Sequence, residues 1–351
     1  MLKVLRFLLL IILISSVSAG DNKYTITGRV TEKSTGKSLI GVNVFLDGTT
    51  IGTTTDRKGL YQIPNVKAGS YKLVVSMIGF ETTTTNVEVQ KGKELEYNFG
   101  LKEKTYEIKS VVVKDKEDFV WQRRFNKFKK LFFGATDFAK ECEILNKEII
   151  EFIETPDRLT GYAPKPLIII NSALGFKIEC VLSEFYYDEV NDKTWFSQYN
   201  YFDKLEPKNE EEKLKWKKNR EYAYETSFEY FVTWLQDEDR DFQRYKFIKS
   251  RYLEKNKYSA TEESKIVYVS DIIRKNQDDS YRLIFPYYLK LSDVKYGTKS
   301  AIKLFYANVA VDKYGFINQT HALEVYGHFS EVGLADKLPN HYYVNPVEQR
   351  N

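Results

Sequence analysis

The residues best suited to chemistry are His328 and Glu331, three positions apart near the C-terminal end of the chain. Zinc binds such residues, but it needs a third protein ligand and an open position. The only later histidine is His341, and the third histidine, His321, lies seven residues before His328. In one strand, an odd separation places two side chains on opposite faces. We therefore expect no metal, no cofactor and no catalytic residue here, only two polar residues at a strand end.

No other catalytic motif stands out. The chain lacks the G-x-S-x-G elbow of many hydrolases. Its 49 acidic residues offer many carboxylate pairs, but the separation that a glycosidase needs cannot be read from a sequence. A hydrolase of unrecognised type therefore stays open as an alternative function.

Aromatic residues are unusually common, with 26 tyrosines and 23 phenylalanines. Flat side chains of this kind pack well on the faces of strands. They also line sites for sugars, and Trp195, Trp216 and Trp234 are the candidate aromatic contacts for such a ligand. Core packing and glycan binding are both consistent with the composition.

The chain has two cysteines, Cys142 and Cys180. In an oxidising compartment they could form a disulfide, which would stabilise the fold by about 2–4 kcal/mol. The alternative is a pair of buried free thiols, because nothing in the sequence fixes their geometry.

Residues 1–19 have the pattern of a secretory signal peptide. Lys3 and Arg6 precede an apolar run at 7–14, and small residues at 17–19 end in Ala19. We therefore expect an exported protein, located in the periplasm, at the outer membrane or on the cell surface. The apolar run is about half as long as a membrane-spanning helix, and no other long run follows, so we expect no transmembrane segment in the mature chain.

The mature chain is close to neutral. Loss of Lys3 and Arg6 reduces the 53 basic residues to 51, against 49 acidic ones. A balance of this kind provides no strong field that would attract nucleic acid. We therefore expect no nucleic-acid partner.

Residues 20–101 read as one all-β domain. Tyr24, Ile26 and Val30 alternate with polar residues, and the same period of two recurs in later segments. Glycines separate these segments, as at the turn formed by residues 56–59. About seven strands at this spacing predict an Ig/transthyretin-like β-sandwich.

Five motifs in this domain support a family resemblance. They lie at 26–30 (ITGRV), 41–44 (GVNV), 52–56 (GTTTD), 59–63 (GLYQI) and 71–80 (YKLVVSMIGF). Residues 23–101 thereby resemble the carboxypeptidase-regulatory-like domain. That family has a transthyretin-like or immunoglobulin-like sandwich, and it occurs beside metallocarboxypeptidases, at the N-terminus of TonB-dependent receptors and in exported Gram-negative proteins. The resemblance implies an accessory folding or docking module rather than a catalyst.

Residues 102–117 are charged, with apolar residues at 111–113, and we interpret them as a linker or last strand. A strand that docks a partner is the alternative.

The segment 117–133 predicts a helix, with aromatic residues on one face at 121, 125, 128 and 132 and basic residues around the rest. We expect a packed helix with a solvated basic face; the alternative is a helix on a membrane surface.

Residues 118–345 predict a mainly-β (α+β) domain with a helical insertion, followed by a tail at 346–351. We expect strands over 149–153, 167–170, 176–185, 194–201, 281–285, 287–291, 302–306 and 321–326, and helices over 209–222 and 223–235. Motifs at 121–124 (WQRR), 174–176 (LGF) and 334–336 (LAD) resemble the uncharacterised C-terminal region of exported carboxypeptidase-regulatory-like proteins. That resemblance implies an architecture but no activity.

The whole chain is therefore predicted to be mainly β. The function that we expect is that of a non-catalytic cell-envelope protein, whose first domain is a protein-docking or structural module with an envelope protein as partner. A glycan-binding envelope protein is the first alternative, and a hydrolase is the second.

Overall fold

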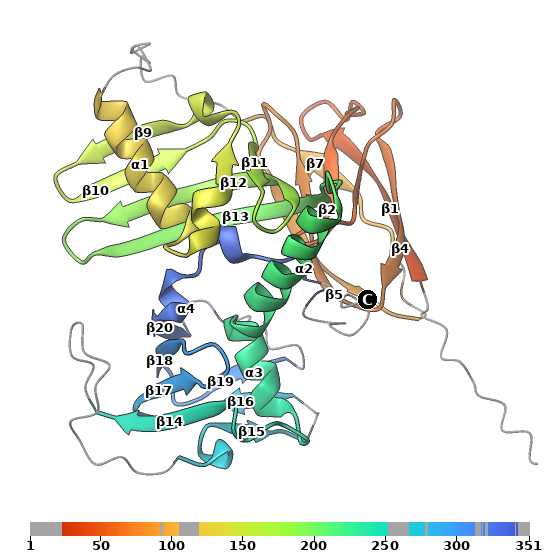
Figure 1. The fold of residues 1–351 in the computed structure, drawn as a ribbon. Coiled ribbons are helices and arrows are strands. Elements are labelled where there is room, and N and C mark those ends of the chain that lie inside the picture. The colour runs from red at the N-terminus through yellow and green to blue at the C-terminus, as the bar shows by residue number, and fades with distance from the viewer. Residues whose placement is uncertain are drawn as a thin grey trace, which may run out of the picture.

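The computed structural model describes residues 23–91, 93, 95–104, 119–251, 267–277, 280–312, 317, 319, 322–340 and 342. The expected signal peptide, most of the expected linker and the C-terminal tail lie outside the described residues, as do His321 and His341. The described part is mainly β, as the sequence predicts (Figure 1). Its helices include none that is long and apolar enough to cross a membrane.

The N-terminal domain is a seven-stranded β-sandwich, as expected. Its strands are β1 (Lys23–Glu32), β2 (Asn43–Leu46), β3 (Gly52–Thr54), β4 (Leu60–Lys67), β5 (Gly69–Ser76), β6 (Thr83–Val89) and β7 (Phe99–Leu101). They form two sheets, in the orders β4-β1-β7 and β3-β2-β5-β6. The period of two buries alternate residues between the sheets, and Ile26, Val30 and Leu73 are fully buried there.

The next part is a six-stranded antiparallel sheet covered by one helix. Its strands are β8 (Cys142–Ile144), β9 (Glu151–Thr155), β10 (Arg158–Tyr162), β11 (Leu167–Asn171), β12 (Phe176–Asp188) and β13 (Lys193–Lys204). Helix α1 (Phe119–Phe133) buries Phe125, Phe128 and Phe132 against this sheet. Gly134, at φ +89°, ends the helix in the left-handed conformation that glycine adopts at little cost.

The helical insertion consists of two helices rather than one continuous run. Asn209 caps α2 (Glu210–Glu225) by accepting a hydrogen bond from the Glu212 N–H, at 2.8 Å. Ser227 caps α3 (Phe228–Gln236) in the same way, from the Tyr230 N–H at 3.0 Å. The predicted helix over 223–235 is therefore interrupted before Phe228, because the Ser227 hydroxyl starts a new helix.

A second hydrophobic core lies beneath α3. Its strands are β14 (Tyr245–Ser250), β15 (Ile273–Lys275), β16 (Tyr281–Leu283), β17 (Tyr288–Asp293), β18 (Lys299–Leu304), β19 (Val309–Val311) and β20 (Leu323–Gly327). They form the sheets β14-β17-β18-β20 and β15-β16-β19. The remaining elements are α4 (His328–Glu331) and the 3-10 helices η1 (Asp137–Glu141), η2 (Lys147–Ile149), η3 (Val269–Asp271) and η4 (Leu334–Asp336). After α4 the chain returns to the core between α1 and the six-stranded sheet, where Leu334 and Leu338 are buried.

A short loop of the sandwich joins it to the rest of the molecule. The loop between β2 and β3 lies against β13, and the Gly48 N–H donates to the Asn200 carbonyl at 2.8 Å. The Phe202 N–H donates to the Thr49 carbonyl at 2.9 Å, and the Asn340 N–H donates to the Gly48 carbonyl at 2.6 Å. The sandwich therefore lies beside the six-stranded sheet, held to it by backbone hydrogen bonds (Figure 1).

Candidate functional site

Helix α1 divides into an aromatic face and a cationic face. The aromatic face is buried in the core, so it is not available to a membrane surface. The other face carries five cations and no acidic residue: Arg123, Arg124, Lys127, Lys129 and Lys130. Two of them, Arg123 and Arg124, lie in the first half of the helix.

Two turns at one end of the sheet bring acidic residues to this cationic face. Glu154 lies in β9, just before the turn to β10, and Glu189 follows the end of β12. The Glu189 N–H donates to the Asp157 carbonyl at 2.9 Å, which joins the two turns. The hairpin that β10 forms with β9 was not predicted from the sequence, and without it Glu154 could not be placed.

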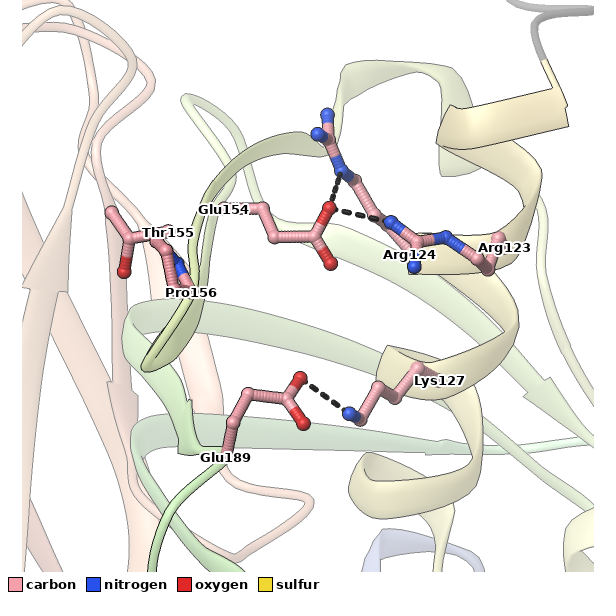
Figure 2. A pocket seen from close by; sticks show the side chains of 7 residues that line it. All are labelled: Arg123, Arg124, Lys127, Glu154, Thr155, Pro156 and Glu189. Carbon is pink, nitrogen blue, oxygen red and sulfur yellow. Dashed lines mark hydrogen bonds and ion pairs between the residues drawn. The ribbon is translucent and has the colours of Figure 1, made fainter.

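These residues surround an open hollow of about 510 Å³. Its walls are Arg123, Arg124, Lys127, Glu154, Thr155, Pro156 and Glu189. Figure 2 shows two arginines of α1 directed at the Glu154 carboxylate, with the Lys127–Glu189 pair one helical turn away. Three cations and two anions therefore meet at one accessible place.

Glu154 satisfies only part of the arginine donors. The Arg123 Nη2 lies 2.6 Å from Glu154 Oε2, and the Arg124 Nε lies 2.9 Å from the same oxygen. The side chains are 57% and 27% exposed, respectively, so their remaining N–H groups are within reach of a ligand. Among the described residues, no other carboxylate pairs with either guanidinium.

Lys127 is fixed by two contacts. Its Nζ lies 2.5 Å from Glu189 Oε1 and 4.1 Å from the centre of the Tyr187 ring. The Tyr187 hydroxyl in turn donates to Asp192 Oδ1 at 2.6 Å. Lys127 is therefore held in place by packing and charge together, and the hollow has a preformed wall on this side.

A second charge cluster has three of its four side chains closed to solvent, and only Lys295 is exposed. Arg244 donates to Glu225 Oε2 at 3.0 Å and to Asp293 Oδ2 at 2.9 Å, and all three side chains are at most 7% exposed. Lys295 donates to Glu225 Oε2 at 2.6 Å. Burial alone would raise the pKa of Glu225, but hydrogen bonds from Lys295 and Arg244 outweigh it and lower that pKa. A general acid needs a raised pKa, so Glu225 favours a structural role.

Two of the three candidate tryptophans are core residues, which favours core packing over ligand contact at these positions. Trp216 is 5% exposed, and its Nε1–H donates to the Ser172 carbonyl at 2.9 Å. Trp234 is 6% exposed and packs on Tyr245 with ring centres 4.8 Å apart. Both lie in the interior because helices α2 and α3 turn their aromatic sides to the cores.

Trp195 is the exception, since it is half-buried on β13. Its ring stacks on Tyr186 with centres 4.9 Å apart, and the Arg158 guanidinium covers the Tyr186 ring at 4.4 Å. The structure does not bring the three tryptophans together, and none of them lines the hollow beside α1.

The two cysteines are buried free thiols, so the disulfide alternative is wrong. Strands β8 and β12 pair with opposite sides of β11, where Cys142 faces Asn171 and Cys180 faces Leu167. This register separates the two Cα atoms by about 10 Å across the sheet and about 13 Å along it. A disulfide needs a Cα separation below about 7 Å.

His328 and Glu331 lie where the sequence places them, directly after strand β20. His328 is 9% exposed, and burial lowers the pKa of its imidazole. Glu331 is exposed to solvent. Within the described residues, no three His, Cys, Asp or Glu side chains are grouped so that they could hold a metal ion.

Comparison with known proteins gives a domain assignment. Residues 26–113 match the family model of the CarboxypepD_reg-like domain. The N-terminal sandwich is a CarboxypepD_reg-like domain. A search of the curated proteins finds no match.

Solved structures give only distant similarity. A cohesin–X-dockerin complex from Acetivibrio cellulolyticus is 29% identical over 20% of this chain and 51% of that chain, with a TM-score of 0.19. A DUF3823 family protein from Bacteroides ovatus is 13% identical over 53% of this chain and 82% of that chain, with a TM-score of 0.19. Another DUF3823 family protein, from Parabacteroides merdae, is 11% identical over 51% of this chain and 80% of that chain, with a TM-score of 0.17. Similarities at this level carry no argument about function.

The hollow beside α1 lies outside the CarboxypepD_reg-like domain. All its lining residues belong to 123–189, whereas the family match ends at residue 113. Any function of the hollow therefore has to be derived from its own residues.

Proposed function

We propose that the protein is a non-catalytic component of the cell envelope, in which the CarboxypepD_reg-like domain docks an envelope protein. One observation carries this proposal, namely the open edge of strand β6. An unpaired strand edge can receive a strand from another protein through backbone hydrogen bonds.

Strand β6 is better suited to this role than the other edges of the sandwich. Among the described residues it pairs only with β5, and its seven residues contain no proline. Strand β4 is also an edge, but it contains Pro64 and has Asn65 at φ +62°, and both features oppose strand addition. Strands β3 and β7 have only three residues each.

The junction with the second domain supports the same function. Backbone hydrogen bonds from Gly48, Phe202 and Asn340 fix the β2–β3 loop on the rest of the protein. A partner bound at β6 would therefore be held in a defined position relative to the second domain. A loosely tethered accessory domain would not have this property.

The test is capture of partners from intact envelopes of the source cells, by crosslinking to the tagged mature protein. The variant Asn86→Lys places a charge on an exposed position of β6, where lysine opposes strand addition. Gln62→Lys places a charge on the exposed side of the already blocked β4. We expect a specific partner to be lost with the β6 variant and retained with Gln62→Lys.

Two further results bear on this proposal. Absence of any protein partner for the wild-type chain would contradict it and would favour glycan binding or catalysis. Export is checked separately by N-terminal sequencing, which we expect to find Gly20 as the first residue of the mature protein.

A further inference from the structure

The hollow beside α1 points to a second, more specific contact. We propose that it binds an acidic side chain of a protein partner, whose carboxylate accepts hydrogen bonds from the N–H groups of Arg123 and Arg124 that Glu154 leaves unused. The inference rests on the proposed function only in that the ligand is a protein, and it concerns a different part of the molecule.

The first argument is the surplus of donors. A guanidinium presents several N–H donors in a planar fork, which matches the two oxygens of a carboxylate. Arg123 uses Nη2 and Arg124 uses Nε, and both reach the same oxygen of Glu154. Neither arginine forms the two parallel hydrogen bonds of a complete arginine–carboxylate pair. A second carboxylate would complete the pairing.

The second argument is electrostatic. Three cations of α1 line the hollow, Arg123, Arg124 and Lys127, against the two carboxylates of Glu154 and Glu189. An external carboxylate placed there would be attracted by the guanidinium groups of Arg123 and Arg124.

The third argument is preorganisation. Lys127 is held by Glu189 and by the Tyr187 ring, and α1 itself is anchored by Phe128, which is fully buried. The walls of the hollow therefore need little rearrangement before a ligand binds. Binding to preformed groups avoids much of the entropy cost of ordering long side chains.

The lining favours a protein over a small molecule or a sugar. Small-molecule sites are lined mainly by apolar and aromatic side chains. The hollow is lined by charged residues, with Thr155 and Pro156 beside them, and no aromatic residue is among them. Exposed arginines with complementary charge are typical of protein interfaces, where they contribute to specificity and to the association rate.

The experiment measures binding of a fluorescent hexaglutamate peptide to the full mature protein by anisotropy, with hexaglutamine as the neutral peptide. Polygalacturonate supplies carboxylates on a glycan and is tested as a competitor. The variant Arg123→Gln/Arg124→Gln removes the proposed donors. The matched control Lys130→Gln/Lys218→Gln also removes two charges, both from exposed helical positions that do not line the hollow.

We expect the arginine variant to bind hexaglutamate about tenfold more weakly than the wild type, because charge-assisted hydrogen bonds are lost. The lysine control should stay within about twofold of the wild type, since distant exposed charges are screened by salt. Glu154→Gln should bind several-fold more tightly, because it removes the competing internal carboxylate. A merely structural role of the arginines would not produce this gain.

Three results would overturn the inference. Equal weakening by the arginine and lysine variants would mean that only net charge matters. Tighter, arginine-dependent binding of polygalacturonate would assign the hollow to an acidic glycan. Absence of hexaglutamate binding by both the wild type and Glu154→Gln would show that the hollow does not bind acidic side chains.

Capture from envelopes separates this inference from the proposed function. If the wild-type chain captures a partner and Arg123→Gln/Arg124→Gln captures it equally well, docking stands and the hollow is not part of it. If the wild-type chain captures none, the proposed function fails, whatever the peptide shows.

Discussion

In the described part of the chain, arginine meets carboxylate in two regions with opposite degrees of solvent access. Arg244 lies between Glu225 and Asp293 in a closed cluster, where each side chain is at most 7% exposed. Arg123 and Arg124 meet Glu154 at the edge of an open hollow, and Arg123 is 57% exposed. The chemical groups are the same and differ in burial, so we expect the closed cluster to maintain the fold and the open one to be accessible to a ligand.

Removal of Arg244 should have the largest effect on stability. Arg244→Met leaves the Asp293 carboxylate buried without its cation and removes one of the cationic donors to Glu225. Breaking one side of a buried ion pair costs about 3–5 kcal/mol. Urea denaturation should show this loss in the free energy of unfolding. A loss below about 1 kcal/mol would mean that the cluster is not a structural element.

Asp336 is a buried carboxylate that forms no ion pair with any described residue, and its removal should stabilise the protein instead of destabilising it. Burial raises its pKa to about 6, although hydrogen bonds from Thr136 and Gly333 oppose the rise. The folded protein then binds more protons than the unfolded one between about pH 4 and 6, so the free energy of unfolding falls as the pH rises through this window.

Asp336→Asn should remove that fall and make the protein more stable at pH 7, by up to about 3 kcal/mol. Melting temperatures measured from pH 4 to 7 for both proteins provide the check. Parallel pH profiles of wild type and variant would contradict this account of Asp336.

At the junction between the domains, a substitution of Gly48 removes no charged group, so it shows how much stability is lost without breaking an ion pair. Gly48 has φ +68°, and a Cβ there would lie 2.7 Å from Asn340 Oδ1. Gly48→Ala should therefore cost about 1–3 kcal/mol and loosen the junction. Gly36, at φ +70° with nothing near its Cβ position, is the matched control for backbone strain alone. Hydrogen exchange at residues 198–202 should increase in Gly48→Ala but not in Gly36→Ala.

The smallest effect on stability should come from the open cluster. Arg123→Gln/Arg124→Gln should change the free energy of unfolding by less than about 1 kcal/mol, because exposed ion pairs contribute little. The same denaturation assay as for Arg244→Met compares them directly. A loss as large as that of Arg244→Met would show that the arginines of α1 also hold the fold together.

Much of the fold could be predicted because its signals are local. The seven strands of the sandwich follow from alternating residues such as Tyr24, Ile26 and Val30, and α1 follows from aromatic residues at helical spacing. Strand β10 was missed because Arg158–Tyr162 is short and contains a glycine. Its place is determined by its pairing with β9 and β12.

The candidate site depends on contacts that no local signal reports. Arg123 and Glu154 are 31 residues apart and meet only because the β9–β10 hairpin reaches the face of α1. The tryptophans illustrate the converse difficulty, since the sequence shows an aromatic residue but not which side of its element is covered. Trp216 and Trp195 therefore looked equivalent, although one is buried and the other half-exposed.

The two free thiols allow the opening rate of strands in the six-stranded sheet to be measured on the unmodified sequence. Burial raises the pKa of Cys142 to about 12, and burial also raises that of Cys180, so both remain protonated and shielded from alkylating reagents in the native state. A thiol reagent can modify them only when β8 or β12 is transiently exposed. The rate of modification of each cysteine therefore reports how often its strand opens. Cys142 reports on β8 at an end of the sheet, and Cys180 reports on β12 at its centre.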